Sequence, residues 1–268
     1  MVTGPSPDDL EARRAYWDDK YLKYWEARTA DQRPLSGDCV PADVAMIERY
    51  LDLLEIAPGD AVLDVGIGFG RLVPALVRRG ADVYGVDISR AMIAEAQRQV
   101  GADVKELRVD SAETISFESG RFDAVLCWAV FDACHQGDAL RQMARVLRLG
   151  GRLLVSGKND DYCDDDDLAY IAEVNARGKG HPNFFTSRAK LVDAVQALGL
   201  REVATTYFVR RGDGSTNTGV TVRPPHFYEY VMICAKERHV EAHERLDVAR
   251  RVSLTCARRQ AAQEAGRT

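Results

Sequence analysis

The hydrophobic pattern of the chain is most regular over residues 61–156, where short apolar runs alternate with amphipathic stretches. The run Ala61–Val65 is short, apolar and rich in valine, which predicts a buried strand. Three alternating glycines follow it: Gly66, Gly68 and Gly70. Apolar residues then recur at helical spacing over 71–79, and Gly80 is the expected end of that helix. The pattern therefore predicts a strand, a glycine turn and a helix in succession.

Four further apolar runs continue this alternation. They predict strands over residues 83–87, 107–112, 122–128 and 152–156. Helices are expected over 90–99, with Ser89 as the N-cap and Gly101 at the end, and over 137–147. A Gly150-Gly151 turn is expected to separate the last helix from the fifth strand. Alternating strands and helices with short links are typical of a parallel sheet covered by helices on both faces.

Two helices are expected before the sheet. The first, over residues 9–28, is unusually aromatic. Four of its side chains share one helical face: Tyr21, Tyr24, Trp25 and Arg28. A polar loop over 29–40 leads to a second helix over Pro41–Leu54. The aromatic stripe predicts either a helix packed on the sheet or a lid over a ligand site.

The regular alternation stops after residue 156. Residues 157–185 are acidic and contain glycine and proline, which predicts an insertion over the mouth of a site. The next expected elements are a helix over 186–198, a strand over 200–209, a polar loop over 210–225 and a strand over 226–235. A charged amphipathic helix over 237–265 is expected as a packed tail or a homodimer contact. The expected units are thus a helical cap (1–57), a sheet domain (58–236) and a C-terminal helix (237–268).

Composition narrows the class of protein. The chain has 268 residues, 46% of them hydrophobic, which suits one domain of usual size with additions. A net charge of −5 argues against nucleic acid as the main partner. Six scattered cysteines with no Cys-x-x-Cys pair suggest neither a disulfide framework nor a zinc site. No long apolar run or signal-type segment is present, so we expect a soluble, cytoplasmic protein without a membrane partner.

The glycine turn and the ends of the strands carry the candidate chemistry. Glycine lets the backbone approach a ligand, and the following helix offers free N–H groups. Asp87 ends the second predicted strand, 19 residues beyond Gly68, where a carboxylate can accept both hydroxyls of an adenosine ribose. Asp110 ends the third strand in the same way. A nucleotide-binding edge is therefore predicted.

Together, the five ordered motifs resemble the class I family of methyltransferases that use S-adenosylmethionine (SAM). The resemblance is close over residues 60–156 and looser to about residue 235. It implies a doubly wound α/β fold, Rossmann-like, with a seven-stranded, mostly parallel sheet. The last strand is expected to run antiparallel between the fifth and sixth. The implied cofactor is SAM, and the implied activity is methyl transfer to a small-molecule acceptor.

The resemblance also implies a set of cofactor residues. The methionine part of SAM would be lined by Asp64, Gly66, Gly68 and Gly70. Asp87 would take the ribose, Ile88 would pack on the adenine, and Asp110 would accept from its amino group. Ser111 and Ala112 would approach the ring through their backbone. From the N-terminal cap, Tyr24 and Arg28 would reach the methionine carboxylate, and Trp128 would flank the cofactor after the fourth strand.

The segment Cys127–His135 corresponds to the part of the family that faces the transferred methyl group. It lacks the Asn/Asp-Pro-Pro-aromatic signature of enzymes that methylate amino groups of DNA bases. His135 is the candidate proton acceptor, although Phe131-Asp132-Ala133 stands where phenolic O-methyltransferases carry His-Asp-Trp. His135 is otherwise a satisfied surface or loop histidine.

Acidic residues near the fourth and fifth strands allow two further interpretations. Asp132, Asn159 and Asp160 could imitate an oxygen-rich magnesium site, but their spacing does not match, so no metal is predicted. The acidic run 160–167 is either a solvated loop or an attraction for a cationic substrate such as an amine.

Two rival functions stay open at this point. An NAD-dependent dehydrogenase shares the glycine turn and the acid after the second strand, but its fingerprint is Gly-x-Gly-x-x-Gly rather than Gly-x-Gly-x-Gly. A SAM-binding module without catalytic activity would share the whole cofactor edge. The favoured prediction is O- or N-methylation of a metabolite or natural-product intermediate.

Overall fold

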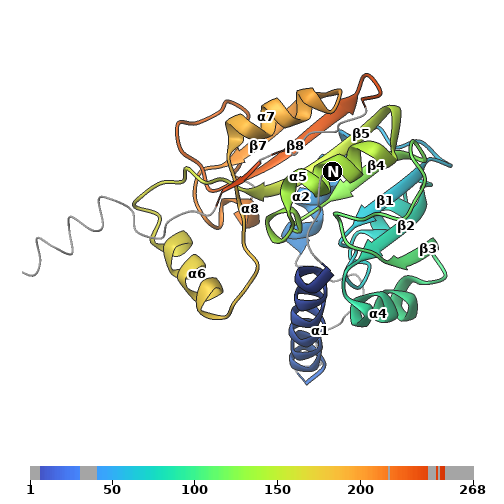
Figure 1. The fold of residues 1–268 in the computed structure, drawn as a ribbon, viewed down its shortest axis with the longest axis horizontal. Coiled ribbons are helices and arrows are strands. Elements are labelled where there is room, and N and C mark those ends of the chain that lie inside the picture. Colours follow the sequence, from blue (N-terminus) through green and yellow to red (C-terminus); the bar gives the residue numbers. More distant parts are fainter. Residues whose placement is uncertain (1–6, 31–40, 217, 241–245, 247, 251–268) are drawn as a thin grey trace, which may run out of the picture.

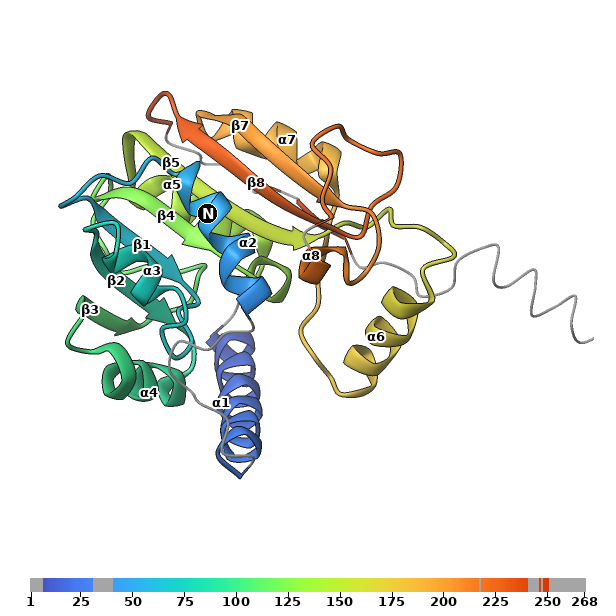
Figure 2. The ribbon, with the colours of Figure 1, turned by 180° about the vertical axis from the view of Figure 1, so that it is seen from behind.

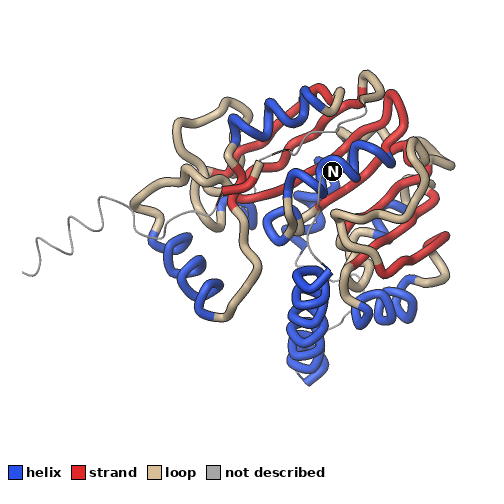
Figure 3. Tube along the Cα trace, viewed as in Figure 1, coloured by secondary structure: helices blue, strands red, loops and turns tan. Residues whose placement is uncertain are grey.

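The computed structural model contains a seven-stranded sheet with helices on both faces (Figures 1 and 3). It describes residues 7–30, 41–216, 218–240, 246 and 248–250. The strand order is β3-β2-β1-β4-β5-β8-β7, and β8 runs antiparallel to both of its neighbours. The strands are β1 (Ala61–Val65), β2 (Asp82–Asp87), β3 (Val104–Val109), β4 (Phe122–Cys127), β5 (Leu147–Lys158), β7 (Leu200–Phe208) and β8 (Glu229–Lys236). The predicted fold class, including the antiparallel last strand, is confirmed.

Apolar helix faces cover the sheet from both sides. The covering helices are α2 (Pro41–Asp52), α3 (Val73–Val77), α4 (Arg90–Val100), α5 (Gln136–Val146) and α7 (Arg188–Ala197). On one face, Leu140 of α5 and Leu191 of α7 are fully buried with β4 and β5 (Figure 1). On the other face, Leu51 of α2 and Leu76 of α3 pack against β1 and β2 (Figure 2). The carboxyl ends of the parallel strands are left for ligands.

Strand β5 differs from its prediction at both ends. It begins at Leu147 and runs through the glycine pair that was expected to be a turn, so the expected boundary is wrong. Gly150 has a φ of +76°, and the pairing with β4 shifts register between Phe122 and Ala124. The glycines therefore form an irregularity inside one strand instead of ending a helix. At its other end, β5 continues to Lys158, which lies at the ligand edge.

Helix α1 (Pro7–Ala30) agrees with the helix expected over 9–28 and lies beside α4 (Figure 1). Its described side chains dock mainly through polar contacts. Arg13 Nη1 lies 2.7 Å from Glu113 Oε1, and Asp18 Oδ1 accepts hydrogen bonds from Ser89 Oγ–H at 2.5 Å and from the N–H of Ala91 at 3.2 Å. The aromatic stripe from Tyr21 to Arg28 belongs to the helix, but its side chains lie outside the described part of the structure.

The predicted insertion after β5 contains a helix that the sequence did not indicate, α6 (Asp167–Gly178). Asp166 caps it, because its Oδ1 accepts the Ala169 N–H at 3.0 Å, while Oδ2 accepts the Arg211 N–H at 2.7 Å. Asp165 pairs with Arg210 at 2.9 Å. The acidic run thus fastens the insertion to the loop after β7, in which α8 (Asp213–Thr216) forms one further turn. These contacts give the acidic run a structural role.

The helix predicted over 237–265 is wrong where the structure describes that region. Residues 237–240 are not helical, and β9 (Ala249–Arg250) pairs antiparallel with β6 (Phe185–Thr186). Val248 is 1% exposed, and its carbonyl accepts the Ser187 N–H at 3.0 Å. Burial of Val248 and backbone pairing with β6 override the helical pattern of the charged sequence. Residues 251–268 lie outside the described residues. In the described part of the chain, no helix is long and apolar enough to cross a membrane.

The docking of helix α1 on the rest of the protein should depend on the Arg13–Glu113 ion pair. We expect Arg13→Met to leave the Glu113 carboxylate without its cation, at a cost of about 3–5 kcal/mol for breaking a buried pair. Hydrogen exchange across residues 9–20 should become faster, while exchange in β1 and β4 stays unchanged.

The control is Glu11→Gln, which removes the exposed Glu11–Arg14 pair and should leave exchange across α1 as it is. Wild-type protection of α1 in the Arg13→Met protein would show that other contacts hold the helix.

Candidate functional site

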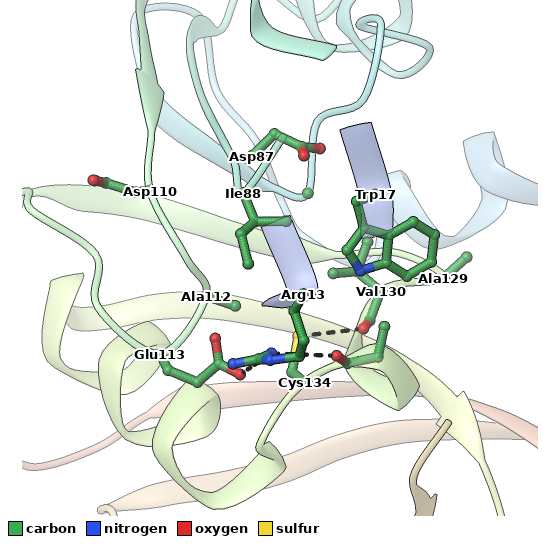
Figure 4. Close-up of a pocket in the computed structure, with 12 residues that line it drawn as sticks. Arg13, Trp17, Asp87, Ile88, Asp110, Ala112, Glu113, Ala129, Val130 and Cys134 are labelled. Carbon is green, nitrogen blue, oxygen red and sulfur yellow. Dashed lines mark hydrogen bonds and ion pairs between the residues drawn. The ribbon is translucent and has the colours of Figure 1, made fainter. Parts of the chain in front are cut away.

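A pocket of about 500 Å³ lies at the carboxyl ends of β1 to β4 and under α1 (Figure 4). Five predicted cofactor residues line it: Gly66, Asp87, Ile88, Asp110 and Ala112. The sequence did not indicate that Arg13 and Trp17 of α1, or Glu113, would line it too. We call this cavity the cofactor pocket.

The glycine turn has the close backbone packing that its sequence predicts. Gly66 has a φ of +78°, and a Cβ atom there would lie 2.3 Å from Val130 Cγ2. Gly68 has a φ of +56°, and its N–H donates to Asp87 Oδ2 at 2.9 Å. A side chain at either position would strain the backbone, and at Gly66 it would also displace the segment after β4.

Asp87 connects this turn to the start of α4. Its Oδ1 accepts the Ser89 N–H at 2.9 Å, while Oδ2 accepts the Gly68 N–H. Burial raises the pKa of Asp87 to about 6, although the two N–H donors favour its charged form. Each carboxylate oxygen has further lone pairs, so a ligand hydroxyl can still donate to it.

Asp64 lies beneath the turn, with 3% of its surface exposed. Its carboxylate has no hydrogen-bond donor among the described residues. Burial raises its pKa to about 7, and the charge of Asp87 adds to this effect against the opposing charge of Arg71. A buried carboxylate in this state favours a cationic ligand group beside it.

Asp110 lines the cofactor pocket as predicted, but one of its two carboxylate oxygens already accepts hydrogen bonds from the protein. Its Oδ2 accepts two hydrogen bonds from Ser116, from the N–H at 2.9 Å and from the hydroxyl at 2.6 Å. Figure 4 shows its carboxylate pointing away from the middle of the pocket. The predicted contact with an adenine amino group would therefore have to use the free oxygen, Oδ1.

Glu113 joins three parts of the site. Its Oε1 accepts from Arg13 Nη1 and from the His135 N–H, each at 2.7 Å, and its other oxygen accepts from the Ser111 hydroxyl. Arg13 Nη2 is buried without a partner in the described structure. This N–H group is thus available to an acceptor atom of a ligand beside α1.

The side chain of His135, the predicted proton acceptor, contacts helix α1 and not the cofactor pocket. Its Nε2 lies 2.9 Å from Asp9 Oδ2 of α1, and its ring packs at 5.4 Å from the ring of Phe184. It lines neither the cofactor pocket nor the cavity next to it. These contacts fit a histidine that helps to hold α1, and its catalytic role stays a prediction.

A second cavity, of about 710 Å³, adjoins the cofactor pocket at the ends of β4, β5 and β8. Its polar lining is Asp132, Ser156, Lys158 and Glu229, and the predicted Trp128 lies in its wall. We call it the chamber. Ala129 lines both cavities, with a φ of +56° and its N–H donated to Ser156 Oγ at 2.7 Å. A left-handed alanine is uncommon and often marks a functional site, here the junction of the two cavities.

Lys158 is the central cation of the chamber. Its Nζ lies 3.1 Å from Asp132 Oδ2 and 3.2 Å from Glu173 Oε1. Burial opposes its charge, but the two carboxylates outweigh that effect and raise the pKa of Lys158. Lys158 also lines a more open third cavity between α1 and α6, beside Lys20 and Arg211. Lys158 therefore lies between the chamber and this third cavity.

Two of the residues considered for magnesium make other contacts, although Asn159 Oδ1 is buried without a partner in the described structure. Asp132 faces Lys158, and Asn159 Nδ2 donates to the carbonyls of Asp161 and Phe227 at 2.8 and 3.2 Å. Within the described ranges, no three His, Cys, Asp or Glu side chains come together as a metal-binding group.

Comparison with known proteins places this chain in a family. The model of the methyltransferase domain matches residues 63–155. A ubiquinone biosynthesis O-methyltransferase of Xanthomonas oryzae is 31% identical over 177 residues, which are 63% of this chain and 72% of the relative. Methyltransferase GfsG of Streptomyces halstedii is 31% identical over 153 residues, 54% of this chain, and the match spans about half of that relative, 52%.

Solved structures share the fold. Magnesium protoporphyrin IX methyltransferase of Synechocystis, solved with bound S-adenosylhomocysteine, aligns with a TM-score of 0.59 at 19% identity, over 85% of this chain and all of that chain. Geranyl diphosphate C-methyltransferase of Streptomyces coelicolor aligns with a TM-score of 0.55 at 20% identity. The alignment covers 72% of this chain and 79% of that chain. The acceptors of these two enzymes differ widely, so the fold does not select an acceptor.

Asp64 should make the stability of the ligand-free protein depend on pH. Its pKa rises from 3.8 to about 7 on folding, so its contribution to stability falls as the pH rises from about 4 to 7. At pH 8, Asp64→Asn removes a buried charge and should raise the free energy of unfolding by about 1–4 kcal/mol. At pH 5, where Asp64 is protonated, the substitution should change little. Urea unfolding at both pH values measures this, and an equal effect at both would contradict the assignment.

Proposed function

This chain belongs to the class I SAM-dependent methyltransferase family, and we propose that it methylates a hydroxyl or amino group of a small molecule held in the chamber. The observation that carries the proposal is that Ala129 lines both the cofactor pocket and the chamber, a cavity with polar groups in its wall. The name of the ubiquinone biosynthesis relative, an O-methyltransferase, supports oxygen as the atom that is methylated.

The residues of the cofactor pocket fit SAM. We propose that Asp87 accepts the ribose hydroxyls and that Ile88 and Ala112 flank the adenine. Asp64 is not in the lining of the pocket, but it lies two residues before Gly66, which is, and we propose that its buried carboxylate binds the ammonium group of the methionine part. Arg13 adds an unpaired N–H donor from α1. Trp128, Tyr24, Arg28 and His135 stay predictions.

Methyl transfer requires mainly that the acceptor atom, the methyl carbon and the sulfur atom lie in line. When bound, SAM supplies the methyl group on a sulfonium, whose leaving group is a neutral thioether. No acid is therefore needed for departure, and the protein contributes by orienting the acceptor and excluding water. In this proposal the acceptor is oriented at Ala129, which lines both cavities, while Arg13 and Trp17 of α1 line the cofactor pocket (Figure 4).

A cationic acceptor drawn in by the acidic run 160–167 is not favoured. Asp165 and Asp166 are engaged with Arg210 and with the backbone of Arg211 and Ala169. The third cavity, which shares Lys158 with the chamber, has more cations than carboxylates in its lining: Lys20, Lys158, Lys179 and Arg211 against Asp19 and Glu173.

Asp87 provides a test of the cofactor assignment. Asp87→Ala removes the acceptor of the ribose hydroxyls and the two N–H bonds that fix the turn, and should weaken S-adenosylhomocysteine binding by about 1–3 kcal/mol. The matched control is Asp82→Ala at the other end of β2, where the carboxylate pairs with Lys105. Calorimetry with both variants measures this, with circular dichroism to confirm folding. An unchanged dissociation constant for Asp87→Ala would remove this residue from the site.

The activity itself is tested in two steps. Calorimetry should show binding of S-adenosylhomocysteine and none of NAD⁺; the reverse result would refute the proposal. Methyl transfer from labelled SAM is then measured on catechol, 4-hydroxybenzoate and tyramine, with EDTA present. We expect turnover on at least one phenol without added metal. Activity that EDTA abolishes and Mg²⁺ restores would bring Asp132 and Asp160 into the catalytic group.

A further inference from the structure

Glu229 is a carboxylate of the chamber that the assignments above leave without a function. It begins β8 and lies directly opposite Lys158 in the antiparallel register with β5. Residues opposite each other in such a pair point to the same face of the sheet. Phe208 of β7 is the partner of Glu229 on the other side, and all three line the chamber. The register thus turns Glu229 toward the cavity in which we place the acceptor.

The other carboxylates near Lys158 are already engaged. Asp132 binds Lys158, and Glu173 binds Lys158, the Tyr228 hydroxyl at 2.5 Å and Asn183. The half-buried carboxylate of Glu229 has no hydrogen bond or ion pair with any described residue. A carboxylate that lines a cavity without a partner is available to a ligand.

We propose that Glu229 is the catalytic base of the reaction, which takes the proton from the acceptor's hydroxyl or neutral amino group. This inference rests on the proposed function. The acceptor's lone pair forms the bond to the methyl carbon as the carbon–sulfur bond breaks. The electron pair of that bond stays on sulfur, which gives S-adenosylhomocysteine, and the proton passes to Glu229. The methylated product leaves through the chamber.

The surroundings of Glu229 suit a base. Burial raises the pKa of its carboxyl group above the ordinary value. The charged groups that face it are Lys158 from β5, Arg211 from the loop after β7, Asp132 from the turn after β4 and Glu173 from α6. The two cations lower its pKa and the two carboxylates raise it, with a net increase. A raised pKa makes the ionised form a stronger proton acceptor near neutral pH.

A binding experiment tests the position of Glu229 without any acceptor. SAM carries a positive sulfonium and S-adenosylhomocysteine does not, so a carboxylate facing the junction should favour SAM. At pH 8, Glu229→Gln should weaken SAM binding about three- to tenfold and leave S-adenosylhomocysteine binding unchanged. The matched control is Glu237→Gln, just beyond the other end of β8, where Glu237 pairs with Arg201. It should change neither constant.

The outcomes separate the two proposals. If the wild-type protein binds neither compound, the proposed function fails. If both bind and Glu229→Gln leaves their affinity ratio unchanged, Glu229 does not face the methyl group and this inference is overturned.

Turnover provides the second readout, with the phenol of the panel that reacts fastest. Glu229→Gln should lower kcat about 100-fold or more and remove the rise of kcat with pH that Glu229 ionisation causes. Glu229→Asp should restore part of the activity. A Glu229→Gln enzyme that keeps its wild-type kcat and pH profile would also overturn the inference.

Discussion

The buried carboxylate of Glu113 joins the sheet, the start of α5 and the N-terminal helix. It accepts from Arg13 of α1, from the backbone of His135 and from the Ser111 hydroxyl. A charge in the interior is stable only with such partners, and an unpaired one is costly. Since Arg13 and Trp17 line the cofactor pocket, the same carboxylate positions the roof of that pocket. The pocket as described exists only while α1 is docked.

The chemistry is distributed along one edge of the sheet. Asp87 ends β2, Ala129 follows β4, Lys158 ends β5 and Glu229 begins β8. In a doubly wound sheet, this edge is where ligands bind. The left-handed backbone of Ala129 separates the cofactor side from the acceptor side, with Lys158 and Glu229 on the acceptor side. Under the proposed function, methyl donor and acceptor lie on the two sides of this one residue.

The sequence predicts the strands and the glycine turn of this edge well because their signals are local. A valine-rich strand, a glycine turn and an acid at the next strand end lie within about thirty residues, and each has its own backbone requirement. The docking of α1 has no such signal, since Arg13 and Glu113 are 100 residues apart. The position of Glu229 opposite Lys158 follows only from the register of β5 with β8, which the sequence alone does not give. The position of His135 after the fourth strand predicts a base near the methyl group, whereas in the fold its ring contacts Asp9.

The account depends most on the cofactor and acceptor meeting at Ala129. A crystal structure with bound S-adenosylhomocysteine tests this most directly. We predict the adenosine beside Asp87 and Ile88 and the sulfur atom at Ala129, facing the chamber with Lys158 and Glu229. A sulfur atom turned away from that chamber, or a cofactor bound outside the pocket under α1, would contradict the account.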